Sequence, residues 1–138
     1  MPKNEFVKIV IDTNLWISFL ISHRQDRLDD LLLDRHVRIL FSAELLDEIS
    51  ATIAKPKLKK YFGADALAEM LFSLEAYIDF IEVKSSVNIC RDPRDNFLLA
   101  LSMDGHADFL ISGDKDLLEL KKFGKTKIVT IASYLGKL

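Results

Sequence analysis

Short hydrophobic runs alternate along the chain with longer stretches in which apolar residues recur at helical spacing. The run Phe6 to Ile11 has the length and β-branched composition of a buried strand, and it stops at the polar residues Asp12 to Asn14. A second such run, Val37 to Phe41, is followed at once by Ser42, a residue type that often begins a helix. The pattern therefore predicts buried strands that end in polar residues and lead into helices.

Apolar residues three or four positions apart predict the helices. Leu45, Ile49 and Ile53 mark one of them, and Pro56 closes it because proline lacks the N–H that a helix interior needs. We expect helices over residues 15–21, 28–33, 42–54, 67–80 and 96–103, a helical turn over 116–120, and further strands over 81–83, 109–112 and 128–131. This alternation favours an α/β fold, a three-layer α/β/α sandwich with a mostly parallel central sheet.

Length and composition narrow the class of protein. The 138 residues contain no repeat, low-complexity tract or linker, which predicts one domain over residues 1–138. The single cysteine, Cys90, excludes an internal disulfide and a zinc ribbon and favours a cytoplasmic location. The apolar stretch Leu15 to Ile21 is too short to span a bilayer, so no membrane segment is expected. The net charge of −2 and pI near 5.9 argue against a protein that mainly coats nucleic acid.

Acidic residues follow the predicted strands. Open α/β sheets bind ligands beyond the carboxyl ends of their strands. Asp12 follows the first strand directly, and Asp114 and Asp116 follow the strand expected near residue 110. Asp95 begins the helix before that strand, and Glu48 lies about one and a half turns into the helix after the second strand. We expect these carboxylates to converge at one edge of the sheet.

Converging carboxylates without a histidine or cysteine cluster indicate a hard metal ion. Like charges a few ångströms apart repel, so such a cluster stays ionised at neutral pH only when a cation lies between its members. Oxygen ligands suit Mg²⁺ or Mn²⁺ better than Zn²⁺. One or two such ions can activate water and neutralise charge on a phosphodiester, so the chemistry indicated is phosphodiester hydrolysis.

Each acid also has a simpler structural explanation. Asp12 and Asp114 can cap the helices that follow them, and Asp95 lies in a good helix start, Asp-Pro-Arg-Asp. Glu44 and Glu48 are one turn apart and can form a solvated helix face. Capping alone would place acids at helix starts anywhere in the chain. Here they follow strand ends, which favours the functional interpretation.

The histidines, glycines and lysines indicate a function less clearly than the acids do. The three histidines, His23, His36 and His106, are far apart and show no ligand spacing, and the five glycines form no phosphate-binding loop. A basic run follows the helix that carries Glu48; it can be a solvated segment or can contact an RNA backbone near the site. Its members are Lys55, Lys57, Lys59 and Lys60.

Four segments together resemble the PIN domain family, and more narrowly its VapC-like ribonuclease toxins of toxin–antitoxin systems. They are IVIDTN at 9–14, SAELLDE at 42–48 followed by Lys55-Pro56-Lys57, DPRDN at 92–96, and ADFLISGDKDL at 107–117. The resemblance runs from Val7 to the last predicted strand. It implies an α/β/α sandwich with Mg²⁺- or Mn²⁺-dependent ribonuclease activity on RNA. It also implies a small antitoxin partner and a homodimer.

The resemblance also assigns roles by position. The family's catalytic and metal-binding acids fall on Asp12, Glu48, Asp95 and Asp114, with Asp116 beside the last as a further ligand. Its supporting polar residues, which orient the carboxylates or the scissile phosphate, fall on Thr13, Asn14 and Ser112. The choices between Glu44 and Glu48 and between Asp114 and Asp116 stay open. The four ligands account for four negative charges, so the rest of the chain carries +2 and the low pI no longer argues against a nucleic-acid substrate.

Two other classes of function compete with the nuclease. A phosphohydrolase for small esters could use Asp12, but its usual design has a second acid two residues later, where this chain has Asn14. A PIN-like module without catalysis could bind RNA or a protein through the same fold. Divalent-ion binding and cleavage assays separate these alternatives.

Overall fold

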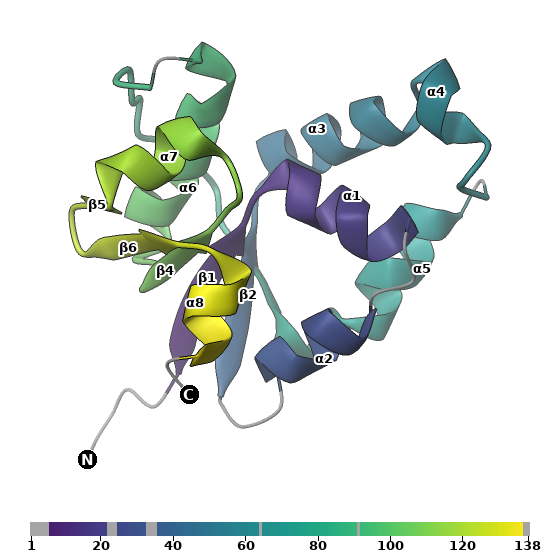
Figure 1. The fold of residues 1–138 in the computed structure, drawn as a ribbon, viewed down its shortest axis with the longest axis horizontal. Helices are drawn as coiled ribbons and strands as arrows, with labels where there is room; N and C mark the ends of the chain where they lie inside the picture. The colour runs from purple at the N-terminus through teal and green to yellow at the C-terminus, as the bar shows by residue number, and fades with distance from the viewer. Residues whose placement is uncertain (1–5, 22–24, 33–35, 64, 91, 137–138) are drawn as a thin grey trace.

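A computed structural model describes residues 6–21, 25–32, 36–63, 65–90 and 92–136 (Figure 1). Within these residues, six strands form one sheet in the order β3-β2-β1-β4-β6-β5. Neighbouring strands are parallel except for β5, which is antiparallel to β6. The strands are β1 (Val7–Ile11), β2 (Val37–Phe41), β3 (Ile78–Phe80), β4 (Phe109–Ile111), β5 (Lys122–Phe123) and β6 (Thr126–Val129).

Helices cover both faces of the sheet, so the expected α/β/α arrangement with a mostly parallel sheet is confirmed. In Figure 1, α1, α2 and α5 lie to the right of the sheet, and α6 and α7 lie to the left. The helices are α1 (Thr13–Ile21), α2 (Gln25–Leu32), α3 (Ala43–Ile53), α4 (Pro56–Lys59), α5 (Ala66–Ser73), α6 (Asn96–Asp104), α7 (Lys115–Leu120) and α8 (Ile131–Gly136), with single 3₁₀ turns η1 (Glu75–Tyr77) and η2 (Pro93–Asp95).

The core is centred on β1 and α6. Ile9, Val10 and Ile11 are all fully buried, because a central parallel strand has a helix layer on each face. Leu99 and Leu101 of α6 are also fully buried, and this helix packs against β1, β2 and β4. Each such side chain stabilises the fold by about 1.5–3 kcal/mol. This packing therefore fixes the position of the end of β1, which Asp12 follows directly.

One predicted helix is wrong over half of its length. The helix expected over 67–80 ends at Ser73, and residues 78–80 form β3, three residues before the strand expected over 81–83. Arg38 of β2 holds this segment extended, because its guanidinium donates to the carbonyl of Ile78 at 3.1 Å and pairs with Asp79 at 2.6 Å. Leu74 and Ile78 fit helical spacing equally well, so local sequence could not show the difference.

Smaller departures from the expected elements occur elsewhere. The basic run after Pro56 forms the short helix α4, and the last parallel strand lies at 126–129 rather than 128–131 because Ile131 begins α8. Strand β5 has only two residues, too few to give a pattern. In the described part of the chain, every helix is too short or too polar to cross a membrane.

Candidate active site

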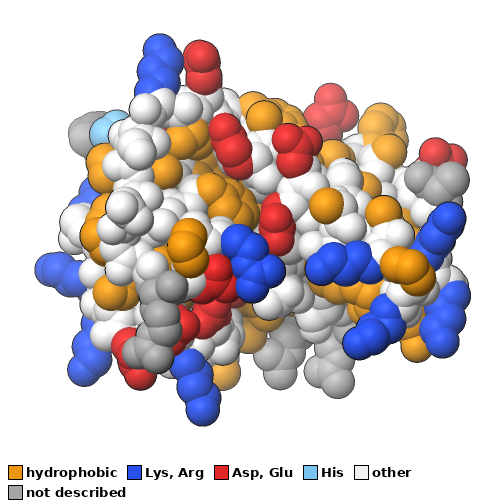
Figure 2. All heavy atoms as spheres, turned by 90° about the horizontal axis from the view of Figure 1, so that it is seen from above, with side chains coloured by type: hydrophobic (Ala, Val, Ile, Leu, Met, Phe, Trp, Pro, Cys, Tyr) orange, Lys and Arg blue, Asp and Glu red, His pale blue; other side chains and the backbone are white. Residues whose placement is uncertain are grey.

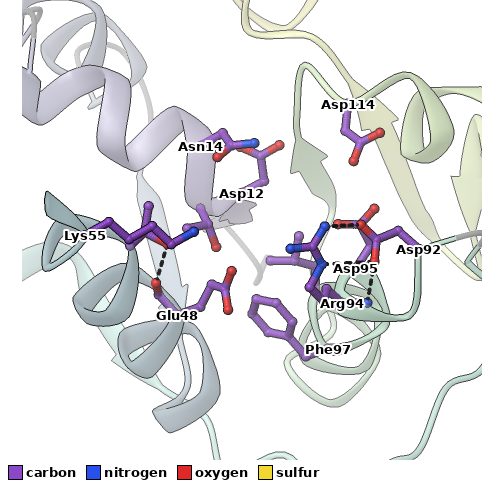
Figure 3. Close-up of a pocket in the computed structure, with 12 residues that line it drawn as sticks. Asp12, Asn14, Glu48, Lys55, Asp92, Arg94, Asp95, Phe97 and Asp114 are labelled. Carbon is purple, nitrogen blue, oxygen red and sulfur yellow. Dashed lines mark hydrogen bonds and ion pairs between the residues drawn. The ribbon is translucent and has the colours of Figure 1, made fainter. Parts of the chain in front are cut away.

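A cavity of about 170 Å³ opens at the carboxyl ends of β1 and β4 (Figure 3). The two strands pair with Ile11 opposite Ile111, so the residues that follow them emerge side by side. On the face that Figure 2 shows, carboxylates gather near the centre with cations beside them. Four of the five acids predicted as ligands line the cavity: Asp12, Glu48, Asp95 and Asp114. They come from four different segments of the chain.

Asp12 is both a helix cap and a wall of the cavity. It is 4% exposed, and its backbone N–H donates to the carbonyl of Ile111 at 3.1 Å. Its Oδ1 accepts the N–H of Leu15 at 2.8 Å and so caps α1, while its Oδ2 accepts a short hydrogen bond from Ser112 Oγ. Burial raises the pKa of the Asp12 carboxyl, and the bonds from Ser112 and Leu15 lower it. The capping role and the site role are thus compatible.

Ser112 connects the two acids that end β1 and β4. Its hydroxyl is fully buried, donates to Asp12 Oδ2 and accepts the backbone N–H of Asp114 at 2.9 Å. Asp114 in turn caps α7, because its Oδ1 accepts the N–H of Asp116 at 2.8 Å. The loop after β4 is therefore held against the start of α1. This arrangement fixes the spacing of the two carboxylates.

Asp95 lies against Asp114, and the contact is unfavourable when both are ionised. Asp95 is the last residue of η2, and Asp92 caps the start of this turn. Burial first, and then the neighbouring Asp114 carboxyl, raise the pKa of Asp95 to about 7. Asp95 Oδ2 is buried and has no hydrogen-bond donor among the described residues. A proton or a cation between the two carboxyls removes the repulsion.

Glu48 faces the same space from α3. Ser42 caps this helix by accepting the N–H of Leu45 at 3.2 Å, so the helix begins where the sequence predicts. Glu48 is half-buried and lines the cavity, whereas Glu44, one turn earlier, is exposed and does not. In Figure 3 the Glu48 carboxylate lies across the cavity from Asp95.

Two cations stand at the edge of the cavity. Arg94 donates through Nε and Nη2 to the two oxygens of Asp92, at 3.2 and 2.9 Å, and this pair holds the pKa of Asp92 below its usual range. Lys55, the residue before α4, is exposed and reaches in from the opposite side in Figure 3. Positive charge therefore flanks the carboxylates on two sides.

Some predicted residues lie outside the cavity lining. Asp116 lines a separate hollow beside Cys90, and its backbone N–H donates to Asp114. Thr13 and Asn14 line the cavity as expected, and Ser112 lies behind it. Among the basic residues, Lys57, Lys59 and Lys60 do not line the cavity. His36 and His106 lie elsewhere, and His23 is outside the described residues.

Several residues that line the cavity were not predicted as site residues, among them Thr52 and Phe97. Thr52 is one helical turn after Glu48, and its Oγ1 donates to the Glu48 carbonyl at 2.7 Å. Phe97 follows Asp95 by two residues, and its half-buried ring forms part of the wall. Helical spacing from Glu48 could have identified Thr52. No comparable signal distinguishes Phe97 from a core aromatic.

The residues fit a hard divalent cation by their chemistry. All the predicted ligands are carboxylates, and neither histidine nor cysteine is among the lining residues. Three buried side-chain polar atoms of the described residues lack a hydrogen-bond partner, and two of them, Thr13 Oγ1 and Asp95 Oδ2, belong to this lining. No three acids of the described chain are close enough together to form a metal cluster.

Comparison with known proteins identifies the family of this chain. A family model described as a PIN domain matches residues 8–116, which include all four acids. The chain belongs to the PIN domain family. This PIN domain is 32% identical over 122 residues to an uncharacterised protein of Methanocaldococcus jannaschii, MJ1680, and the match covers 86% of this chain and 78% of the relative.

Two solved structures share the fold of this PIN domain. VapBC2 from Rickettsia felis, bound to a DNA fragment from its promoter, matches with a TM-score of 0.61 and 14% identity over 88% of this chain and 97% of that chain. PAE2754 from Pyrobaculum aerophilum matches with a TM-score of 0.54 and 16% identity over 95% of this chain and 88% of that chain. At these identities the likeness shows the fold alone.

Proposed function

We propose that this PIN domain is an endoribonuclease that depends on a divalent metal ion, Mg²⁺ or Mn²⁺. The observation that carries the proposal is the cavity at the carboxyl ends of β1 and β4, which four carboxylates from separate segments line without histidine or cysteine. PIN domains are generally nucleases, and the family membership supports the same class of reaction. A bound ion supplies water activation and neutralises charge on the scissile phosphate.

The chain's own residues would hold and orient the reacting groups. Asp12, Glu48, Asp95 and Asp114 would hold the ion, and Asp116 would support Asp114 through the backbone N–H that it donates. Ser112 would keep Asp12 and Asp114 in place through its two hydrogen bonds. Thr13 Oγ1, which is buried without a partner among the described residues, and the exposed Asn14 amide would face the scissile phosphate.

A toxin role in a toxin–antitoxin pair follows from the same resemblance. The Rickettsia felis structure is a VapBC pair on promoter DNA, and its toxin-like fold supports a small antitoxin as a partner of this chain. We place the protein in the cytoplasm, with RNA as its substrate and a homodimer as its working form. On this view, expression in a host cell arrests growth, and Asp12→Asn abolishes the arrest.

Cleavage of RNA by matched variants tests the nuclease directly. With Mg²⁺ or Mn²⁺, the wild type should cleave RNA, and EDTA should stop the reaction. Asp12→Asn and Glu48→Gln should each lower the cleavage rate by at least about 100-fold, because each removes an anionic ligand. Glu44→Gln, on the exposed side of the same helix, should leave the rate unchanged.

Two outcomes would contradict the proposal. Cleavage that is indifferent to EDTA would remove the metal from the mechanism, and equal rates for Glu44→Gln and Glu48→Gln would remove Glu48 from the site. A second candidate, a PIN domain that binds RNA or protein without catalysis, is favoured by the absence of a three-acid cluster in the described residues. Calorimetry that detects no divalent-ion binding, together with no cleavage, would support it.

A further inference from the structure

The short helix α4 presents a basic and aromatic surface beside the cavity. Lys57, Lys59 and Lys60 are exposed, and Tyr61 is 56% exposed, with the Lys60 ammonium 5.3 Å from the centre of its ring. Leu58 packs against the core, and so does Phe62, the residue after Tyr61. The apolar anchoring of this segment is thus complete without Tyr61. The ring is therefore available to a ligand.

The charges of this surface are unbalanced. Among the described residues, no carboxylate lies within ion-pair distance of Lys55, Lys57, Lys59 or Lys60, whereas Arg38, Arg94 and Lys125 each have an acid partner. Figure 2 shows blue side chains gathered, with an orange one among them, on the side where Figure 1 places α4. Unpaired cations next to an exposed aromatic ring are the combination that binds single-stranded nucleic acid.

Lys55 connects the α4 surface to the acidic cavity. It lines the cavity and directly precedes α4, so the exposed Lys57 and Lys59 are the next cations along the chain from the cavity. The outer face of α3 offers a poorer exit, because Glu44 and Asp47 are exposed there and would repel phosphates. The distribution of charge therefore favours a path for the substrate's phosphates across α4 over a path across α3.

We propose that single-stranded RNA leaves the cavity across α4, with Lys55, Lys57 and Lys59 on its phosphates and the Tyr61 ring stacked on an unpaired base. This inference rests on the proposed ribonuclease function and names the surface that would bind its substrate. Stacking on Tyr61 needs a base that is free of its partner, so a duplex cannot use this surface in the same way. Lysines contact phosphates without reading sequence, so this contribution to binding is independent of sequence.

Binding of a labelled single-stranded RNA of about 16 nucleotides, measured in EDTA so that no cleavage occurs, tests the α4 surface. The double variant Lys57→Ala/Lys59→Ala should weaken binding and make the negative slope of log K against log salt shallower by about 1.4, since each phosphate contact in a single strand contributes about −0.7. The double variant Lys122→Ala/Lys127→Ala removes the same charge from β5 and β6 and should leave the slope nearly unchanged.

The aromatic contact has its own pair of variants. Tyr61→Ala should raise the Kd for single-stranded RNA at least about fivefold, and Tyr61→Phe should restore it, because the ring rather than the hydroxyl stacks. Phe72→Ala removes a ring that is 78% exposed on α5 and should not change the Kd. In cleavage assays with Mg²⁺, the α4 variants should raise KM and leave kcat intact.

Several outcomes would overturn the inference. If the wild type cleaves RNA while the α4 variants bind and cleave as it does, the α4 surface is not used and the nuclease stands. If double-stranded RNA competes as well as single-stranded RNA, the substrate class is wrong. If the wild type neither binds nor cleaves RNA, the proposed function falls together with this inference.

Discussion

At the scale of single residues, Ser112 connects two of the acids predicted to form the site. A small polar residue before the last acid was predicted to support the site, and the structure places its buried hydroxyl between Asp12 and the backbone of Asp114. Position along the chain could predict that such a residue lies near the acids. It could not show that one hydroxyl bonds to both loops, because that contact joins residues 100 positions apart.

Ser112→Ala should therefore destabilise the protein and impair cleavage together. Loss of the hydroxyl leaves a buried Asp12 oxygen without its donor, which costs about 1–3 kcal/mol of unfolding free energy in a denaturant titration. Ser102→Ala provides the control, because its buried hydroxyl donates only to the Leu98 carbonyl within α6. That variant should keep its cleavage rate. Wild-type stability in Ser112→Ala would contradict the role assigned to this hydroxyl.

At the scale of elements, the strands of the sheet centre were predictable and the edge was not. Val37–Phe41 is confirmed as β2 to the residue, because its residues other than Arg38 are apolar and buried, as in a strand that is covered on both faces. The edge strand β3 has three partly exposed residues, and a tertiary contact from Arg38 decides its conformation. A contact between distant residues of this kind cannot be predicted from the residues next to β3 in the sequence.

Arg38→Met should loosen β3 selectively. Its guanidinium donates to the carbonyls of Ala76 and Ile78 and pairs with Asp79, all near the surface, so the expected loss of unfolding free energy is about 1 kcal/mol. Amide hydrogen exchange should accelerate at residues 78–81 and stay unchanged in β4. Lys127→Met, an exposed change on β6, should affect neither measurement. Unchanged exchange in β3 would show that the backbone pairing suffices.

At the scale of the whole molecule, the acids make stability depend on pH. The fold and the meeting of four acids at one sheet edge were predictable from strand order, but the close contact of Asp95 with Asp114 was not, because it depends on how η2 turns. Burial and Asp114 raise the pKa of Asp95 to about 7, above its ordinary value of 3.8. A raised carboxyl pKa means that folding favours the protonated form.

The metal-free protein should therefore lose stability as the pH rises. The contribution of Asp95 is fully present below about pH 4 and is lost as the pH rises to about 7, and Asp12, whose pKa is also raised, acts in the same direction. Melting curves in EDTA should show this loss, and Asp95→Asn should reduce it. Mg²⁺ at pH 7 should raise the Tm of the wild type more than that of Asp95→Asn. A Tm that is independent of Mg²⁺ would argue against an ion at this site.

The hydrogen bond between Ser112 and Asp12, which spans 100 positions of the chain, has a consequence for biosynthesis. A nascent chain that has exposed only its first half carries Asp12 and Glu48 but lacks the loop that positions them. The cavity of the proposed ribonuclease is therefore complete in each chain only after β4 has left the ribosome and joined the sheet beside β1.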